Sequence, residues 1–500
     1  MSDLSIEELV NKEIENKKSI KRGLLYNGFY QLLITLTPLI TAPYISRTLG
    51  ADGYGFFNYT VSIAFYFFTI AMLGVNTYGN REIAKVRDDK RKRSNTFWQI
   101  YYMQLFLGLL STILYLLFVT FFIKEEKALF YLQGLYVFST CTDINWYAFG
   151  MEEFKLMTIR NTVVKLVSMV FLFCFVKSPS DLAIYFLIYV FGVILGLLPI
   201  WPLVIRTTSF VKPKPEEIIK HFKPNFILFL PYVALSLYQQ MDRLMIGAFV
   251  SKAEVGYYVY AESIIAVSLG LMTTITNVML PRSSYLVGMG KKEESDKLFE
   301  ITLKYTGIIN IAICFGIIAV ADVFIPWYLG RDFDYTATLL MILAPGVIVT
   351  GVGTIIRSQM LIPYGQEKEY TIAITCGTIT NLVLNTLLIF WLHAIGACIA
   401  TVLANLIVML VEMYYTRDKY SYAQHLKEMM PHYLDGIIML GILIVIKSRI
   451  TGLGSFAEVI VIVGTGCVVF GIVEYIILIV IERDPVAAEF IERIIRKRIF

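Results

Sequence analysis

Long apolar runs, repeated along almost the whole chain, constrain its fold more than any other feature. Each run holds about 17–27 residues, and about 20 apolar residues in a helix are enough to cross a bilayer core of roughly 30 Å. We therefore predict about fourteen transmembrane helices. They are at residues 24–46, 57–79, 97–123, 128–149, 159–177, 182–205, 225–250, 255–280, 305–329, 337–361, 371–392, 394–415, 433–449 and 456–481.

The composition agrees with a chain that lies mostly in lipid. Hydrophobic residues make up 57% of the 500 residues and charged residues only 17%, whereas soluble globular proteins have about 45–50% and 25%. Strand-like alternation of apolar and polar residues is absent, which argues against a transmembrane barrel. The predicted fold class is an all-α integral membrane protein.

Lysine and arginine residues are distributed unevenly between the two sides of this predicted topology. With the N-terminus inside, only eight of the 44 fall on the outer side, and three lie within spans. The eight are Arg47, Lys124, Lys127, Lys177, Lys252, Arg331, Lys447 and Arg449. Because cytoplasmic loops are enriched in these residues, we expect both termini to be cytoplasmic. The net charge of +5 is spread over many loops, which favours contact with anionic lipid and not with nucleic acid.

The two ends and the cysteines suggest no further chemistry. Residues 1–23 are predicted to form a cytoplasmic amphipathic segment, because Ser5 and Glu8 have capping-box spacing and apolar residues follow at helical intervals. The first apolar run is full length, so we expect an uncleaved span and no signal peptide. Residues 482–500 form a basic cytoplasmic tail. All six cysteines lie in apolar runs without metal spacing, so we expect no disulfide.

An internal repeat divides the chain into two halves. The segment Gly55-Phe-Phe-Asn-Tyr-Thr-Val-Ser-Ile63 resembles Gly256-Tyr-Tyr-Val-Tyr-Ala-Glu-Ser-Ile264, and each follows the span that opens its half. Six spans separate the copies, so both halves keep one orientation, which predicts parallel repeats around a central cavity. The expected parts are an N-lobe at 24–205, a Pro-containing cytoplasmic linker at 206–224, a C-lobe at 225–415 and two extra spans within 416–481.

Charged residues inside spans are the candidates for function. A charge in hydrocarbon costs at least about 2.5–3.5 kcal/mol, so each should face a cavity or a partner. The candidates are Asp143, Lys165, Asp242, Arg243, Glu262, Arg357 and Glu474, with Arg47 at the outer end of the first span. Glu262 is at a depth from which it could pair with Arg243. A fixed ion pair and a role in a cavity both remain open for these two residues.

The other members of this group have plainer alternatives. Lys165 and Arg357 are near the cytoplasmic ends of their spans, where snorkelling explains them as well as a function does. Glu474 is interpreted as a packing feature of the last span. Near Asp143, an interfacial aromatic belt explains Trp146 and Tyr147.

Helix-breaking residues recur at corresponding places in the two halves. Pro38 and Pro43 interrupt the first span, and Pro231 and Gly247 interrupt the seventh. Paired interruptions are typical of transport pathways, so we predict hinges at these four residues. Ordinary kinking is the alternative at any single position.

Motifs for catalysis or energy conversion are missing from the sequence. There is no GxxxxGK[ST] loop, no GxSxG and no HExxH, and the four histidines are scattered without metal spacing. We therefore predict a transporter that hydrolyses no nucleotide and holds no cofactor or metal. A membrane glycosyltransferase or polymerase is disfavoured because no loop is long enough for a catalytic domain.

Several motifs, in order, resemble bacterial polysaccharide repeat-unit flippases of the Wzx type. They are Pro38-Leu-Ile-Thr-Ala-Pro-Tyr-Ile-Ser-Arg-Thr-Leu-Gly50, Tyr54-Gly55, Tyr78-Gly-Asn-Arg81, Trp146 to Gly150, Tyr238-Gln-Gln-Met-Asp242-Arg243, Gly256-Tyr and Met279-Leu-Pro281-Arg282. This family belongs to the multidrug/oligosaccharidyl-lipid/polysaccharide (MOP) exporter superfamily. The resemblance implies two six-helix lobes around a central cavity, two extra C-terminal helices, and alternating access.

The resemblance also implies a substrate, an oligosaccharide repeat unit on undecaprenyl diphosphate that is turned outward across the bacterial cell membrane. Its polymer would be capsule, exopolysaccharide or O-antigen, and the polymerase machinery would be a partner. Arg47 and Arg243 are the expected diphosphate contacts, because guanidinium groups bind phosphate oxygens in pairs. Asp242, Glu262 and Asp143 would line the cavity or couple Na⁺ or H⁺, or the membrane potential would drive transport. A cation-coupled drug exporter and a peptidoglycan-precursor flippase are the alternatives within the superfamily.

Overall fold

Helices make up nearly all of the chain that the computed structural model describes, residues 6–450 and 455–489. Side chains are described for these residues except 6–36, 230–235, 237, 238, 271 and 455. The described part contains no strand, which confirms the predicted all-α class. Contacts between Cα atoms divide the chain into an N-terminal unit, Met1–Leu244, and a C-terminal unit, Met245–Phe500.

Nine described helices are long and apolar enough to cross a membrane, or ten if the bent pair Arg331–Leu343 and Pro345–Leu361 counts as one span. Two of the nine are pairs of helices that continue across a sharp backbone break. Shorter or less apolar helices also coincide with predicted spans. The described helices are therefore consistent with the fourteen spans expected, although they do not establish that number.

Helix α1 (Ile6–Met72) changes direction at Gly50. Gly50 has φ 68° and ψ −179°, a conformation open to glycine and strained for residues with a Cβ. Pro38 and Pro43, predicted as hinges, lie within the helical part before this break. The backbone is helical without a break from Ile6 to the turn at Gly50, so residues 6–23 do not form a helix separate from the first span.

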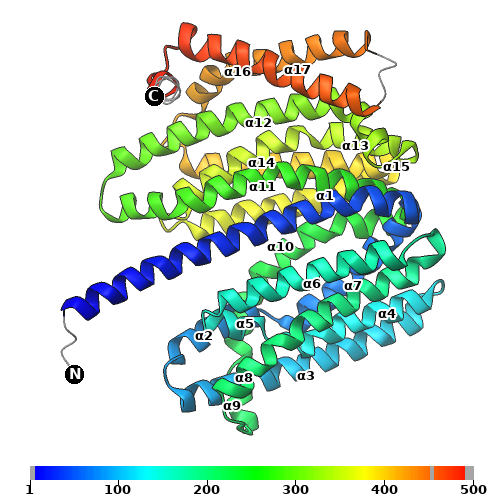
Figure 1. Ribbon diagram of the computed structural model, residues 1–500, viewed down its shortest axis with the longest axis vertical. Helices are drawn as coiled ribbons and strands as arrows, with labels where there is room; N and C mark the ends of the chain where they lie inside the picture. Colours follow the sequence, from blue (N-terminus) through cyan, green and yellow to red (C-terminus); the bar gives the residue numbers. More distant parts are fainter. Residues whose placement is uncertain (1–5, 451–454, 490–500) are drawn as a thin grey trace. The chain divides into compact units, whose positions relative to one another are not determined.

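The N-terminal unit contains four helices that lie side by side in the order α6, α7, α4 and α3 (Figure 1). Its elements after α1 are α2 (Val75–Val86), α3 (Lys90–Phe122), α4 (Lys127–Phe138), η1 (Ser139–Cys141), α5 (Asn145–Gly150), α6 (Phe154–Phe175), η2 (Pro179–Asp181), α7 (Leu182–Leu197), η3 (Leu198–Ile200), α8 (Trp201–Thr207), α9 (Pro215–Ile219) and most of α10 (Phe222–Phe249). The division between the units falls inside α10, beyond the 206–224 segment expected to link two lobes.

The predicted span at 128–149 is not one continuous helix. Helix α4 ends at Phe138, and α5 begins only at Asn145. Gln104 of α3 explains the break, because its Nε2 donates to the carbonyl oxygens of Thr140 and Asp143, each 2.6 Å away. The side chain thus satisfies carbonyl groups that an unbroken helix would satisfy internally.

Trp146 and Tyr147 are fully buried, so their interpretation as an interfacial aromatic belt was wrong. The Trp146 ring packs on α2 at Gly79, where an added Cβ would lie 2.6 Å from its Cε3 atom. Its Nε1 donates to Gln104 Oε1 at 2.8 Å. Burial with a satisfied polar atom is the usual state of a core tryptophan, and this one anchors α5 between α2 and α3.

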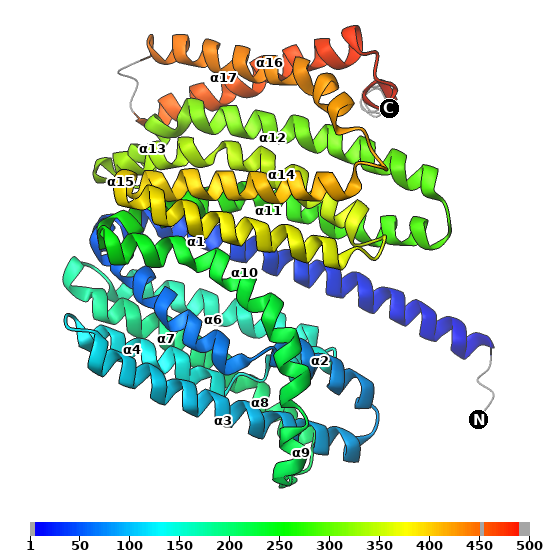
Figure 2. The ribbon, with the colours of Figure 1, turned by 180° about the vertical axis from the view of Figure 1, so that it is seen from behind.

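Helix α12 is the centre of the C-terminal unit, in contact with α11, α13, α14, α16 and α17 (Figure 2). The elements are α11 (Lys252–Gly288), α12 (Lys292–Tyr328), η4 (Arg331–Phe333), α13 (Asp334–Leu343), α14 (Pro345–Ile356), the π-helix η5 (Arg357–Leu361), α15 (Glu367–Thr416), α16 (Tyr422–Lys447), α17 (Ser455–Tyr475) and the π-helix η6 (Ile476–Ile481). The predicted span at 337–361 is thus bent between α13 and α14.

Helix α15 contains two of the predicted spans, and they meet at the boundary expected near residue 393. His393 has φ 57° and ψ −134°, which reverses the chain within one residue. Glu254 of α11 stabilises the turn. Its Oε2 accepts a hydrogen bond from the backbone N–H of Ala394 at 2.8 Å, and its Oε1 lies 3.2 Å from His393 Nδ1. A carboxylate is favoured there because it meets the positive end of the second helix.

Candidate functional site

Asp242 and Arg243, near the end of α10, face different neighbours in the N-terminal unit. Asp242 is 6% exposed and interacts electrostatically with Tyr66 of α1. Arg243 is half-buried and interacts with Tyr189 of α7. This separation agrees with adjacent residues lying about 100° apart around a helix.

A polar contact two residues before Asp242 fixes this end of α10 against the second half of α1. Ser62 donates from its hydroxyl to Gln240 Oε1 at 3.0 Å. Ser62 is fully buried, and Gln240 is half-buried. A hydrogen bond of this kind holds the helix rotation that directs Asp242 and Arg243 to their separate neighbours.

Arg47 lies on the last turn of α1 before the Gly50 break, and its side chain is exposed. Its Nη1 is 3.5 Å from the carbonyl oxygen of Pro43, one turn earlier. Tyr44, on the same turn, ties α1 to the end of α6 by donating to the Val176 carbonyl at 2.6 Å. The guanidinium is therefore presented from a turn whose backbone is anchored.

Glu262 lies in the first half of α11 and is half-buried. It belongs to the C-terminal unit, whereas Arg243 belongs to the N-terminal unit. Their pairing stays a prediction. Gly247, a predicted hinge, is buried in helical α10, and the side chain of Pro231 lies outside the described residues.

Asp143 is buried within the N-terminal unit, in the break before α5. Its Oδ1 accepts a hydrogen bond from the backbone N–H of Asn145 at 3.0 Å, and Arg160 of α6 is close enough to interact with it electrostatically. Arg160 Nη1 in turn donates to Asn145 Oδ1 at 2.8 Å. These contacts hold the α4–α5 break together, which gives Asp143 a structural task in this unit.

Arg357 is held by a residue absent from the sequence-based candidates. Its Nε lies 3.0 Å from Oε1 of Glu412, whose side chain is 0% exposed, and its guanidinium lies over the ring of Tyr370. Gly353 makes room for the acid, because an added Cβ there would lie 2.9 Å from Glu412 Oε2. This contact is a buried ion pair between η5 and α15, which favours pairing over snorkelling. Lys165, the other secondary candidate, is half-buried on α6.

The contact between His432 and Glu474 was also not predicted from the sequence. His432 was counted among scattered histidines and Glu474 was interpreted as a packing feature, but they meet between α16 and α17, where His432 Nδ1 lies 3.0 Å from Glu474 Oε2. Asp435, one turn from His432, is fully buried. A histidine followed three residues later by an acid, opposite an acid on the next span, was the available signal.

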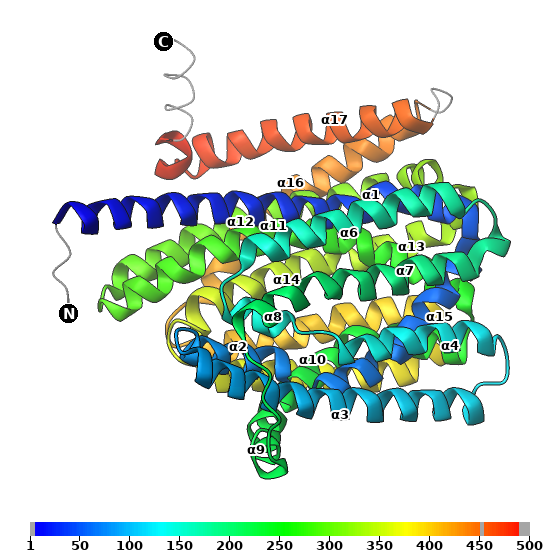
Figure 3. The ribbon, with the colours of Figure 1, turned by 60° about the horizontal axis from the view of Figure 1, so that its bottom comes forward.

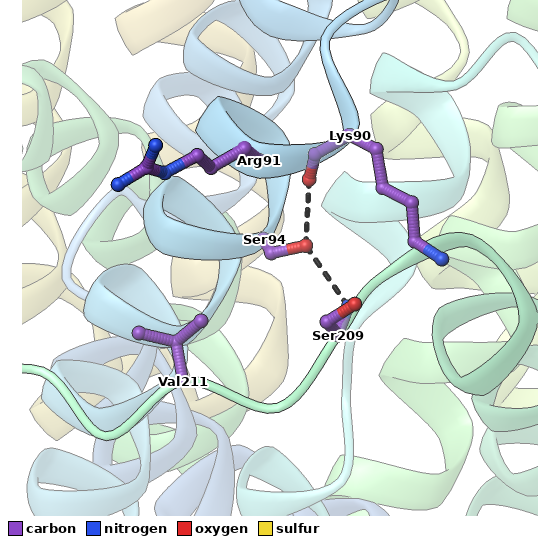
Figure 4. Close-up of a pocket in the computed structure, with 5 residues that line it drawn as sticks. All are labelled: Lys90, Arg91, Ser94, Ser209 and Val211. Atoms are coloured by element: carbon purple, nitrogen blue, oxygen red, sulfur yellow. Dashed lines mark hydrogen bonds between the residues drawn. The ribbon is translucent and has the colours of Figure 1, made fainter.

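A small basic pocket of about 270 Å³ opens where α3 begins (Figure 4). Lys90, Arg91, Ser94, Ser209 and Val211 line it, and Ser94 Oγ accepts a hydrogen bond from the backbone N–H of Ser209 at 2.9 Å. This bond holds the extended segment after α8 against α3. Beyond it, α9 projects from the end of the unit (Figure 3).

His221, just before α10, joins three helices through its ring. Its Nδ1 lies 2.8 Å from the Tyr78 hydroxyl of α2, and its Nε2 lies 3.1 Å from Gln99 Oε1 of α3. A neutral ring with the proton on Nε2 satisfies both contacts. Burial, followed by the nearby Lys220, lowers the pKa of His221 to about 4.

The contribution of His221 to the stability of the purified protein is therefore expected to fall as the pH is lowered from about 6.5 towards about 4. In this window the unfolded histidine gains a proton and the folded one does not, so the folded state loses free energy relative to the unfolded state. Thermal unfolding in detergent measures the effect. His221→Gln, which keeps a polar side chain that cannot titrate, should flatten this part of the pH profile. An unchanged slope in that variant would contradict the assignment.

The apolar helices and the charged groups buried among them are those of a multi-pass membrane transporter. The chain belongs to the polysaccharide biosynthesis protein family, whose sequence model matches residues 20–287. It is 23% identical over 408 residues to a putative O-antigen transporter of Escherichia coli (strain K12), covering 81% of this chain and 98% of that protein. It is 22% identical over 270 residues to a probable low-salt glycan biosynthesis flippase, Agl15 of Haloferax volcanii, covering 54% and 57%.

Solved structures agree on the fold. The lipid II flippase MurJ, in an inward closed conformation, is similar with a TM-score of 0.73 and 18% identity, covering 91% of this chain and 98% of that chain. An inward-facing multidrug resistance MATE transporter of the MOP superfamily gives a TM-score of 0.57 at 15% identity, covering 79% and 96%. The expected MOP-type architecture is confirmed at the level of the fold, and the relatives found by sequence are named as a transporter and a flippase.

Proposed function

We propose that this protein turns oligosaccharide repeat units, linked to undecaprenyl diphosphate, from the cytoplasmic to the outer leaflet of a bacterial cell membrane. The observation that carries the proposal is membership of the polysaccharide biosynthesis protein family over more than half of the chain. Relatives named as an O-antigen transporter and as a glycan biosynthesis flippase support the same substrate class. The product would supply O-antigen, capsule or exopolysaccharide.

Arg47 and Arg243 are the proposed contacts of the diphosphate. Both side chains have some solvent exposure, Arg47 beside the Gly50 break and Arg243 at the end of α10. A guanidinium presents paired donors to phosphate oxygens and is always charged. The polyprenyl tail would remain in lipid throughout, so that only the charged head and sugars need a polar path.

Transport of this substrate needs no nucleotide hydrolysis. With the cell interior negative, moving about two negative charges outward is favoured by roughly 4–5 kcal/mol per 100 mV. Asp242 and Glu262 are the proposed residues for any coupling to Na⁺ or H⁺ entry, within an alternating-access cycle. Both termini are proposed to be cytoplasmic, and the polymerase machinery would receive the substrate on the outer side.

Deletion of the gene is the experiment that tests this function. We expect surface polysaccharide to disappear and lipid-linked repeat units to accumulate in the inner leaflet, because synthesis continues while translocation stops. Lipid extraction measures the accumulation, and protection of the sugars from an added membrane-impermeant glycosidase shows the leaflet. The wild-type gene on a plasmid should restore both phenotypes.

Two other outcomes would reject the proposal in favour of a related activity. Normal surface polysaccharide together with lost ion-dependent dye efflux would identify a drug exporter. Arrested growth with trapped peptidoglycan precursor would identify a flippase for that lipid.

A further inference from the structure

Three ionisable residues are buried together between the last two helices of the C-terminal unit. His432 and Asp435 lie one turn apart on α16, and Glu474 lies opposite on α17. His432 and Asp435 are 0% exposed and Glu474 is 7% exposed. Both helices pack on α12 (Figure 2). Such a group in a membrane-embedded helix pair is costly unless each charge is compensated.

The imidazole of His432 lies between two carboxyl groups. Its Nδ1 is 3.0 Å from Glu474 Oε2, and its Nε2 is 3.2 Å from Glu482 Oε1, within ion-pair distance. Glu482 follows the π-helix η6 and is 20% exposed. An imidazolium is attracted to both carboxylates, but only Nδ1 makes a hydrogen bond, because Nε2 has no hydrogen-bond partner among the described residues.

The chain of contacts continues outward from Glu482 to α12. Lys304 of α12 donates to Glu482 Oε2 at 2.8 Å and to Asp484 Oδ2 at 2.5 Å. Asp484 Oδ1 also accepts from the Tyr305 hydroxyl at 3.0 Å and from the backbone N–H of Val486 at 2.9 Å. The outer end is therefore well supplied with donors and partly open to solvent.

Asp435 stands apart because neither of its carboxylate oxygens has a hydrogen-bond partner among the described residues. Its interacting neighbours are the acid Glu474 and the imidazole of His432. One imidazolium, shared between Glu474 and Glu482, cannot also compensate Asp435, so two facing carboxylates away from water need a further positive charge or a proton. Asp435 is thus a fully buried acceptor in a place where the structure supplies no donor.

We propose that His432, Asp435 and Glu474 form a proton-binding site, in which Asp435 carries a proton that it donates to Glu474. The proton exchanges with the aqueous phase at the end of the unit where Glu482 and Lys304 are exposed. This site is separate from Asp242 and Glu262, and it does not depend on the identity of the transported lipid.

One added proton gives each of the four carboxyl groups in this series of contacts, Asp435, Glu474, Glu482 and Asp484, a positively charged or hydrogen-bonding neighbour. Protonated Asp435 donates to Glu474, which also accepts from His432. His432 reaches Glu482 with its second nitrogen, and Lys304 bridges Glu482 and Asp484. The link between His432 Nε2 and Glu482 Oε1 is an ion-pair contact and not a hydrogen bond. Loss of the proton would leave two adjoining negative charges, which repel α16 from α17.

The remaining titratable groups near the site belong to α16 and α12. His425 and Glu428 lie one to two turns before His432 on α16, and His425 interacts with Glu428, His432 and Lys304. Tyr433 of α16 instead faces Cys314 of α12. None of these side chains approaches the Asp435 oxygens within hydrogen-bond distance among the described residues.

Infrared difference spectroscopy of the full-length protein in nanodiscs tests the proposal directly. During a pH titration, wild type should show a carboxylic-acid C=O band that disappears in Asp435→Asn. Glu474→Gln changes the acceptor and removes the like charge that favours protonated Asp435, so the band should shift or lose intensity. Asp418→Asn, at a carboxyl that is 91% exposed, is the matched control and should leave the band unchanged.

Thermal unfolding gives a second readout. An unfolded aspartate releases its proton above a pH of about 4. If the folded site keeps its proton, the contribution of Asp435 to stability, measured as wild type minus Asp435→Asn at each pH, must fall as the pH rises above that value. Asp435→Asn should remove this slope, because asparagine is a neutral donor in both states.

Two results would overturn the proposal. The first is a band that persists in Asp435→Asn and is unchanged in Glu474→Gln. The second is a band that vanishes at constant pH when Na⁺ replaces choline, because the site would then bind a metal cation. Should Asp435→Asn fail to fold, the Glu474→Gln spectrum alone decides between a changed and an unchanged band.

Discussion

Replacing Arg243 with alanine should abolish export of the lipid-linked repeat unit while the protein still inserts into the membrane. Hydrogen bonds to charged groups contribute about 1.5–3 kcal/mol, which corresponds to a loss of roughly 10–100-fold in affinity for the diphosphate group of the substrate. Complementation of the deletion strain, scored by surface polysaccharide and by trapped lipid-linked repeat units, measures the effect. Arg243→Lys keeps the charge but loses the planar fork, so it should restore export only in part.

The matched control is Arg206→Ala, which removes an exposed arginine at the end of α8. It should export like wild type at equal protein levels. Normal export by Arg243→Ala would exclude this residue as the diphosphate contact. A loss of the Arg243→Ala protein from the membrane would instead show that the residue supports folding.

Removing the cation from the Arg357–Glu412 pair should cause a large loss of stability. Arg357→Met leaves the carboxylate of Glu412, 0% exposed, without a counter-charge. Breaking buried pairs in this way costs about 3–5 kcal/mol, and we expect the lower end because the Arg357 side chain is 26% exposed. Thermal unfolding of the purified variant, together with its level in the membrane, measures the loss.

A second substitution shows whether the stability is lost because the Glu412 charge has no partner or because the Arg357 side chain no longer packs. Arg357→Met combined with Glu412→Gln removes both charges and should recover most of the stability lost in the single variant. The exposed pair Arg417 and Asp418, 3.9 Å apart, supplies the control, since Arg417→Met should have almost no effect. A double variant as unstable as Arg357→Met would mean that the charge on Glu412 is not the cause.

Features that depend on neighbouring residues were predictable from the sequence. Apolar runs long enough for a bilayer predicted the all-helical class. The combined length of the run through residue 393 also predicted a boundary between two spans there, although no polar loop separates them. Gly55 follows the Gly50 break in α1 and Gly256 lies near the start of α11, and the internal repeat that relates them stays a prediction. Local hydrophobicity and glycine conformation decide such features.

Features that depend on distant partners were not predictable. The apolar run at 128–149 reads as one span, but Gln104, far away in the sequence, takes the carbonyls that would have continued the helix. Trp146 is of a residue type common in interfacial belts. It is buried here because Gly79, which has no side chain, leaves room for its ring.

Charge pairs between helices were hidden in the same way. Glu412 lies at the end of a strongly apolar run, and the sequence does not indicate that Arg357 lies beside it. Which acid faces which base is set by helix rotation and tilt, and a single sequence does not contain that information. The same limit applies to the pairing predicted for Arg243 and Glu262.

The single-residue turn at His393 limits how the C-terminal unit can deform. Its two arms are each roughly 35–39 Å long, and at Gly396 the backbones are so close that an added Cβ would lie 2.4 Å from the Leu388 carbonyl oxygen. Such a short, clamped connection leaves no slack for one arm to slide past the other. The two arms of α15 should therefore move together as one rigid body. Any bending that an inward-to-outward change requires must occur elsewhere, for example at the bend between α13 and α14.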